Sequence, residues 1–512
     1  MASPTDDESI FDRLQQQRED PKVLEERQKA VNERIHSIYE KAQTRLGELI
    51  DDNTTLPCTI SSIQVLNATR TRRSFLHTVL SPLLSSNMDR PYTLAEVLQE
   101  VSKCTDKLHR FDIFEQPISV YLDKPSQTEP STTPTDLDVY LSVKERSRFI
   151  LKTGTDLGNG EGSAYANAQW RNIFGGAESF NVNFSKGTRT QSAYQGVFQT
   201  PLFGNPDFRF ELGGVKSDSL KPWASYEETI RGAWARLHWL NDRENRHEVG
   251  LNGFWRQTAA NGMNVSPAVR ADAGHSMKTS ISHTWTHDQR DNPILPSRGH
   301  YVKTINELAG YGPLKSDVSF LKSEFETQAV LPIPGPKGDT GITFTSSFRA
   351  GLLYPLGFDS SMTRRPRIND RFQLGGPTDV RGFKLSGLGP HEGGDALGGD
   401  VYAAGSANLF FPLPRVGRDT PLRLQAFINS GRLLPLKMPN GDAPQTMAQA
   451  NDSVVHTVSE LANGLPSTAA GVGLVYAHPV ARFELNFSLP LVLRKGEEGR
   501  KGLQFGVGIS FL

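Results

Sequence analysis

The chain has 512 residues, and its 56 basic and 56 acidic side chains cancel to a net charge of zero. No global electrostatic field therefore directs it to nucleic acid or to an anionic surface. Two cysteines, Cys58 and Cys104, are too few for a disulfide framework, and they favour two free thiols outside a strongly oxidising compartment. No run approaches ~20 apolar residues, which excludes a membrane protein built from helices.

The first 55 residues predict a helical extension. The opening stretch MASPTDDESIFDRLQQQRED has no apolar core for a secretory signal and is too acidic for a mitochondrial presequence. Residues 20–50 have the periodicity of an amphipathic helix, which we expect to be a surface or docking helix. Its apolar face would contain Val31, Ile35, Ile38, Ala42, Leu46 and Leu49.

Residues 56–146 predict a small α+β domain. The stretch CTISSIQVLNAT has the pattern of a strand, and RSFLHTVLSPLLSS and TLAEVLQEVSKCTDKLHRF have the pattern of helices. Two further strands, PISVYLDK and DLDVYLSVKE, flank a polar loop rich in proline, serine and threonine. An order of strand, helix, helix, strand, strand suits a compact α+β unit.

From residue 147 to 512 the helical signals vanish and strand follows strand. In PLRLQAFINS and ARFELNFSL every second residue is apolar, and most of the residues between them are polar. A soluble sandwich has roughly seven to nine strands in about 100 residues, and this pattern continues for much longer. About sixteen strands with their connections, roughly 23 residues each, fit a transmembrane antiparallel β-barrel. The last alternating stretch, Leu503 to Phe511, can pair with the first strand and bury its apolar face in lipid.

One connection, from about Gly357 to Asp400, is too long for an ordinary loop. Its centre, FQLGGPTDVRGF, resembles the signature of the long sixth loop of the outer-membrane insertase superfamily, which includes the bacterial barrel-assembly protein BamA. The stretch from Thr286 to Val302, THDQRDNPILPSRGHYV, resembles a second hallmark of that superfamily, a D-x-R-x-x-P…P-x-x-G hairpin. With the alternating final strand, these resemblances cover the whole barrel and imply a mostly β fold with one N-terminal POTRA domain.

Within the superfamily the chain is similar to the mitochondrial branch, the core barrel subunit of the sorting and assembly machinery (SAM complex). Bacterial relatives carry a signal peptide and usually several POTRA domains, whereas residues 56–146 leave room for one. The resemblance implies insertion of β-barrel precursors, such as the voltage-dependent porin and the import-channel barrel, into the mitochondrial outer membrane. It also implies peripheral SAM subunits on the cytosolic side and a POTRA domain in the intermembrane space. We expect membrane lipid around the barrel, and no enzymatic activity, cofactor, metal or nucleic acid.

A precursor strand cannot enter lipid with an unpaired backbone, so the machine must offer a strand edge as a template. We expect this edge at the seam between the first and last strands, which the client strand would open as a lateral gate. Gly506 and Gly508 would weaken the last strand, and its sequence fits the insertion signal of the family, a polar residue, a glycine and two spaced hydrophobic residues. The gate residues would be Phe149, Ile150, Leu151, Lys152, Thr153, Gly154 and Thr155 on the first strand, and Gln504, Gly506, Gly508, Ile509 and Phe511 on the last.

The long loop is expected to fold into the lumen and place the motif Val380, Arg381, Gly382 and Phe383 against the barrel wall. Arg381 would need a hydrogen-bonding partner there, because an unpaired buried guanidinium is costly. The acids that bacterial relatives use fall on Asn408 and Asn429 in this sequence, and these amides cannot form a salt bridge. Either Arg381 is held more weakly, or its acid lies elsewhere, Glu484 being one candidate.

Several other residue patterns have plainer interpretations than a functional site. His283 and His287 could bind a metal, but two polar residues of the lumen or rim are favoured because no further ligand is nearby. The glycine runs GNGEG and GLGPHEGG predict turns, since no helix follows either of them. For the whole chain, the alternative to an insertase is a polypeptide-translocating pore; a plain porin would need neither a POTRA-like domain nor the VRGF loop.

Overall fold

The computed structural model divides into two units. Unit 1 comprises residues 1–69, 76–110 and 114–145, and unit 2 comprises 70–75, 111–113 and 146–512. The structure describes residues 41, 44–45, 47–48 and 51–512, except 90–91, 126–131, 159–160, 243, 263, 311–315, 336–337, 358–361, 364–365, 414–419, 438–444, 480 and 509–510. Most of the amphipathic helix expected at 20–50 therefore lies outside the described residues.

Unit 1 is an α+β fold in which a four-stranded sheet has the order β2-β1-β4-β3. The central strands β1 and β4 pair in parallel, and β2 and β3 join them antiparallel. This arrangement is the POTRA-like region that the order of predicted elements indicates. Its elements are β1 (Pro57–Leu66), α3 (Arg73–Asp89), β2 (Tyr92–Thr93), α4 (Leu94–Arg110), β3 (Ser119–Asp123) and β4 (Asp136–Ser142).

Helix α4 shows why this segment folds as it does. It begins with a capping box, in which Thr93 Oγ1 accepts from the Glu96 N–H at 3.3 Å and the Glu96 carboxylate accepts from the Thr93 N–H at 3.0 Å. Basic side chains in its last turn complement the negative end of the helix dipole. One face of the helix is buried in the core of unit 1; it consists of Val97, Val101, Cys104 and Leu108.

The two cysteines of unit 1 are free and buried. Burial raises the pKa of Cys58, and it raises the pKa of Cys104 to about 11. Because the thiolate is the reactive form, we expect Cys104 to resist alkylation at neutral pH until the unit unfolds. Mass spectrometry after a short iodoacetamide pulse, with and without denaturant, would measure this; rapid labelling of the native protein would contradict it.

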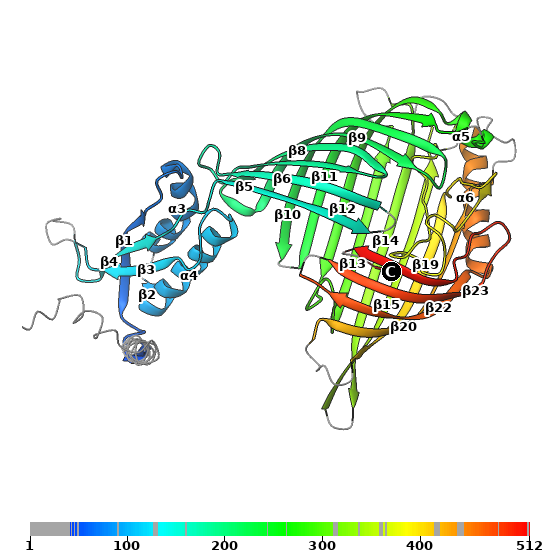
Figure 1. Cartoon of the computed structure of the whole chain (residues 1–512). Coiled ribbons are helices and arrows are strands. Elements are labelled where there is room, and N and C mark those ends of the chain that lie inside the picture. The colour runs from blue at the N-terminus through cyan, green and yellow to red at the C-terminus, as the bar shows by residue number, and fades with distance from the viewer. Residues whose placement is uncertain are drawn as a thin grey trace, which may run out of the picture. The chain divides into compact units, whose positions relative to one another are not determined.

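Unit 2 contains one 16-stranded antiparallel sheet among its described residues, and Figure 1 shows it curling into a barrel. Each of the sixteen strands pairs with the next one along the chain, although the two-residue strands of the connections lie between some of these neighbours in the sequence. The end strands are β5 and β24. This confirms the predicted barrel of about sixteen strands. They are β5 (Phe149–Gly158), β6 (Glu161–Arg171), β7 (Ser179–Gly187), β8 (Thr190–Leu202), β9 (Asn205–Lys221), β10 (Tyr226–Asp242), β11 (Asn245–Ala260), β12 (Gly274–Asp288), β13 (Gly299–Ala309), β14 (Phe320–Gly335), β15 (Gly338–Pro355), β19 (Val401–Pro412), β20 (Leu422–Leu434), β22 (Ser467–Ala477), β23 (Arg482–Val492) and β24 (Gly502–Gly508).

The two faces of the barrel strands differ as the alternation predicts. On β23 the side chains of Leu485 and Phe487 are exposed on the outer face, whereas Glu484 and Asn486 are buried on the inner face. The inner face is identified by the long loop, whose Asp370 contacts Arg256 on β11 and Lys278 on β12. The polar residues of the alternating stretches therefore face the lumen.

The expectation that helices end near residue 146 is wrong. Helices α5 (Pro267–Ala271) and α6 (Met447–Asn463) lie in connections at one end of the barrel (Figure 1). Helix α6 begins with a capping box made by Thr446 and Gln449, a signal that the sequence contains. Four two-residue strands also lie in the connections, β16 (Met362–Thr363), β17 (His391–Glu392), β18 (Asp395–Ala396) and β21 (Gln445–Thr446).

Among the helices in the described part of the chain, none has both the length and the apolar character needed to cross a membrane.

Candidate functional site

The connection between β15 and β19 folds into the barrel lumen and forms a hydrophobic core there. Its side chains Leu374, Val380, Phe383 and Leu388 are buried against wall residues that include Leu433. Ion pairs fix the loop upstream of this core. Arg256 binds Asp370 through two hydrogen bonds of 2.7 and 3.0 Å, and Lys278 lies 3.3 Å from the same carboxylate. The loop is therefore a packed part of the barrel.

Arg381 is fully buried at the centre of this arrangement and pairs with Glu484 on β23. Its Nε donates to Glu484 Oε2 at 2.9 Å, its Nη2 donates to Oε1 at 3.2 Å, and its Nη1 donates to the backbone oxygen of Leu512 at 3.0 Å. The guanidinium also lies over the ring of Phe427. This bidentate geometry is the strongest form of an arginine–carboxylate contact. Of the possible partners in the sequence, Glu484 is the one that holds Arg381.

Glu484 serves two cations at once. The side chain of Arg482 also contacts its carboxylate, and Gln425 and Asn486 donate to it at 3.2 and 2.7 Å. All of these side chains are buried. One carboxylate thus pairs with two buried guanidinium groups, and the amide donors satisfy its remaining lone pairs.

The two asparagines considered as wall partners have other roles. Asn429 donates from its side chain to the backbone oxygen of Arg381 at 3.3 Å, so it holds the loop backbone rather than the guanidinium. Asn408 donates to Ser406 Oγ at 3.1 Å. Neither asparagine therefore binds the Arg381 guanidinium, because Glu484 accepts the hydrogen bonds from its Nε and Nη2.

A single side chain ties the loop motif to the last strand. Gln504 on β24 accepts from the Gly382 N–H at 2.8 Å and from Ser488 Oγ at 3.0 Å, and it donates to the Phe383 carbonyl at 3.1 Å. It is only 3% exposed. The conformation of the loop and the position of β24 are thereby coupled through two hydrogen bonds, while the third holds Gln504 to β23.

Gly382 must be glycine for two separable reasons. Its φ of +87° is strained for other residues, and a Cβ at this position would lie 2.6 Å from the Ala469 Cβ. We expect Gly382→Ala to undock the loop and lower the thermal stability of the barrel. Gly394→Ala is a matched control, because its φ of +94° carries the same strain but nothing lies within 4 Å.

The temperature at which the barrel unfolds, followed by its mobility on gels run without boiling, measures the effect of both variants. The second substitution Ala469→Gly should restore part of the loss in Gly382→Ala by removing the clash. Equal effects of Gly382→Ala and Gly394→Ala would contradict a role for close contact.

The end strands β5 and β24 lie next to each other without a hydrogen-bonded register in the described residues. Their Cα atoms approach within 8 Å, and the sheet order ends at both strands. Strand β5 contains all the residues proposed for the first edge, and its Phe149 and Leu151 are exposed. Among the described strands of the 16-stranded sheet, this is where an edge is available.

The last strand is shorter than the alternation predicts. Strand β24 contains Gln504, Gly506 and Gly508, whereas Ile509 lies outside the described residues. Phe511 is not part of the strand and does not face lipid; it is buried, with its ring 4.9 Å from the Arg482 guanidinium and 5.8 Å from that of Arg381. Contact with two buried cations outweighs continuation of the strand.

The second motif forms the turn between β12 and β13, at the opposite end of the barrel from α5 and α6. Arg290 binds Asp288 at 2.9 and 2.8 Å and stacks on Tyr301. A pocket beside it is lined by residues of this turn together with Arg482 and Phe511. The turn therefore reaches the buried network that holds Arg381.

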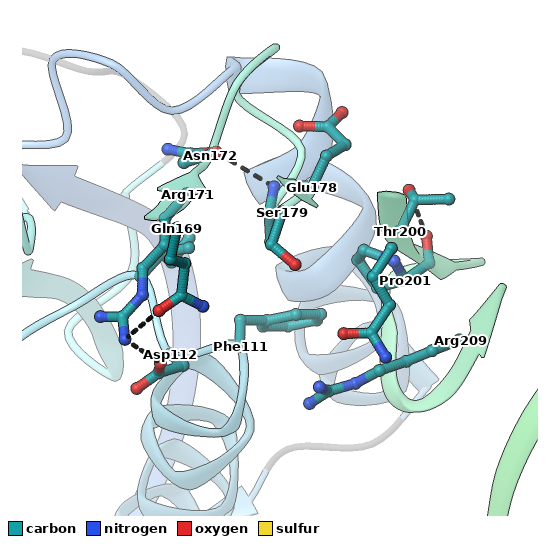
Figure 2. Close-up of a pocket in the computed structure, with 13 residues that line it drawn as sticks. Phe111, Asp112, Gln169, Arg171, Asn172, Glu178, Ser179, Thr200, Pro201 and Arg209 are labelled. Carbon is teal, nitrogen blue, oxygen red and sulfur yellow. Dashed lines mark hydrogen bonds and ion pairs between the residues drawn. The ribbon is translucent and has the colours of Figure 1, made fainter. Parts of the chain in front are cut away.

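Another pocket within unit 2 is lined by the first strands of the barrel and by residues 111–113 (Figure 2). Arg171 lies between Asp112 and Gln169, at 3.1 Å from each of them (Figure 2). Arg146 approaches Asp112 at 2.6 Å. Because these charged groups already pair with each other, the pocket is better explained by packing within unit 2 than by a ligand site.

The sequence favours a position in the lumen or at the rim for His283 and His287. In the structure they do not face the lumen. They alternate with the luminal Lys278 on β12 and so lie on the outer face, near the end of the barrel at which β12 finishes. His283 lies 3.4 Å from His247, and Trp285 and Trp239 share this face. No group of three or more potential metal ligands occurs among the described residues.

Comparisons with known proteins agree on one family. Residues 172–511 match the model of the Omp85 superfamily domain. A SAM50-like protein of Schizosaccharomyces pombe is 38% identical over 94% of this chain and 97% of its own length. The human sorting and assembly machinery component 50 homolog is 35% identical over 82% of this chain and 84% of its own length. Among solved structures, BamA from Haemophilus ducreyi has the same fold, with a TM-score of 0.67 at 15% identity over 88% of this chain and 84% of that one.

Proposed function

This chain belongs to the Omp85 superfamily and is a homologue of the SAM50 proteins, and on that basis we propose that it inserts β-barrel precursors into the mitochondrial outer membrane by strand templating at the seam between β5 and β24. The observation that carries the proposal is the contact of Gln504 with Gly382 and Phe383. It joins the signature loop of the superfamily to one of the two strands that form the seam.

The physical case for templating rests on backbone pairing. Each unpaired N–H or C=O group in the hydrocarbon core costs several kcal/mol, so a client strand needs a partner as it enters. The edge of β5 can supply that partner when β24 moves aside. Pairing is then exchanged between β24 and the client, and the free-energy difference between the two states stays small.

The proposal includes the surroundings of the barrel. Lipid contacts its outer wall, the POTRA-like unit faces the intermembrane space, and peripheral SAM subunits bind on the cytosolic side. Porin and import-channel precursors are the expected clients. The mechanism needs no cofactor and no enzymatic step, because strand exchange only breaks and forms backbone hydrogen bonds and is close to balanced in free energy.

Cross-linking of an arrested client tests the proposal. Cysteines are placed one at a time along β5 at Leu151, Thr153 and Thr155, and in the lumen at Ser347, a buried position on β15. The last strand of a porin precursor should be captured by the β5 positions and not by Ser347. Capture in the lumen alone would support the alternative, a polypeptide-translocating pore, and would overturn templating.

A covalent staple of the seam is the second arm of the test. Disulfides between β5 and the outward-facing positions Phe505 or Val507 of β24 should stop client insertion, and reduction should restore it. Insertion at the normal rate with the staple closed would exclude the seam as the site of exchange.

A further inference from the structure

Helix α6 lies on the outer face of the barrel wall. It packs against Leu352 and Tyr354 of β15 and against Val401 of β19. Leu352 and Tyr354 are on the same face of β15 as the exposed Phe348, and Val401 pairs with Leu352. Since the luminal residues of β15 are the alternate ones, such as the buried Ser347, the helix sits on the side of the wall that faces the membrane.

The buried side of α6 is fixed by both apolar and polar contacts. Val454 joins Val401 and Leu436 in a small core, and Leu461 packs beside them. Ser453 donates to the Lys437 carbonyl at 2.7 Å, and Lys437 approaches Glu460 at 2.6 Å. The helix is thus a fixed element of the wall in the described structure.

The C-terminal end of α6 covers a charge on the outer face. Arg432 on β20 pairs with Ala403 and faces outward, yet it is only 5% exposed. Its guanidinium donates to the carbonyls of Glu460 and Leu461 at the helix end, where the dipole favours a cation. Gly464 leaves room for this contact, because a Cβ there would overlap Arg432. An arginine on the lipid face would otherwise be costly.

The exposed side of α6 has two unlike flanks. From Val455 onward one flank is apolar: Val455 is 70% exposed and Val458 is 42% exposed, with Ala462 beside them, and Leu465 follows the helix at 83%. The opposite flank carries the polar side chains of Asp452, His456, Ser459 and Asn463. A helix with this division favours an interface between lipid and water.

We propose that the apolar flank of α6, formed by Val455, Val458, Ala462 and Leu465, inserts into the lipid acyl chains at the rim of the barrel, while its polar flank remains in water. The argument is continuity: the helix extends a wall whose exposed residues, such as Phe348 and Ile428, already face lipid. It also shields the outward Arg432. This inference goes beyond client insertion and does not depend on the proposed seam mechanism.

Strand pairing links this helix to the long loop. Strand β21, which ends at the N-cap of α6, pairs with β16 at the start of the loop: Met362 with Thr446, and Thr363 with Gln445. Lipid contact at α6 would therefore hold the start of the loop, at Met362 and Thr363, at a fixed depth in the membrane.

Site-specific fluorescence quenching tests the proposal. An environment-sensitive label is attached to Val458→Cys and, as a matched control, to His456→Cys, which lies about 160° around the helix at 3.6 residues per turn. Both positions are exposed, and the native cysteines are buried. The full chain is reconstituted in phosphatidylcholine vesicles with a nitroxide on the acyl chains, and iodide is used as the quencher from water.

We expect the label at 458 to be quenched several-fold more strongly by the acyl nitroxide than the label at 456, and iodide to give the reverse order. Equal iodide quenching at both positions would overturn the proposal, because the apolar flank would then lie in water. The measurement is repeated in outer membranes that contain the partner subunits. Protection of position 458 from both quenchers there would show that protein covers this flank, which also overturns the proposal. A label at Val455→Cys repeats the test should position 458 perturb folding.

Discussion

Replacing Glu484 with glutamine should destabilise the barrel more than replacing Arg381 does. Arg381 and Arg482 are both buried, and Glu484 is the carboxylate that both contact. The variant removes the carboxylate that the two neighbouring guanidinium groups share. Removing one partner of a buried ion pair costs about 3–5 kcal/mol, and here a repulsion between cations is added. Arg381→Met leaves Glu484 paired with Arg482, so we expect a smaller loss.

Denaturant titration followed by the gel mobility of the folded barrel gives the two free energies of unfolding. Glu326→Gln is a matched control, because Glu326 pairs with Arg349 on the luminal wall but both side chains are partly exposed. We expect about 0–1 kcal/mol for that control. Adding Arg381→Met to Glu484→Gln should restore part of the stability, since one uncompensated cation is removed. Equal losses in the two single variants would show that the shared carboxylate is not what holds the network together.

The barrel could be predicted from the sequence because a strand has a period of two. In ARFELNFSL the period alone places Arg482, Glu484 and Asn486 on one face, and the structure buries all three in the lumen. The number of strands followed from chain length, since the thickness of a membrane limits the length of each strand. The strand pattern depends on the local sequence, and the number of strands depends on the chain length and the thickness of the membrane.

The partner of Arg381 could not be predicted in the same way. Arg381 and Glu484 are 103 positions apart, and their contact depends on how deep the loop descends into the lumen. No periodicity encodes that depth. The same reason explains Phe511, whose place in the alternation predicts a strand but whose ring lies beside two buried cations. Helix α6 was missed although the sequence holds its capping box, because the surrounding strand pattern dominates that region.

Replacing Gln504 with leucine should release the loop motif from the last strand. Leucine has a similar size but neither accepts nor donates, so the Gly382 N–H and the Phe383 carbonyl lose their partner in a buried site. Each orphaned group costs about 1–3 kcal/mol. The effect should be local, because upstream of the motif the loop is held separately by Asp370 and its contacts with Arg256 and Lys278.

Hydrogen exchange of the reconstituted protein measures this release, and the peptide around Asp370 is its internal reference. We expect exchange to rise in peptides that cover Arg381, Gly382 and Phe383, while a peptide around Asp370 keeps its protection. Phe505→Leu, on the outer face of the same strand, is the control for β24 and should leave both peptides unchanged. If exchange rises in both peptides of the Gln504 variant, the loop moves as one body, and Gln504 does not hold the motif separately from the region around Asp370. If neither changes, the two hydrogen bonds of Gln504 to the motif do not couple the loop to the strand, and client capture at β5 would have to proceed without that coupling.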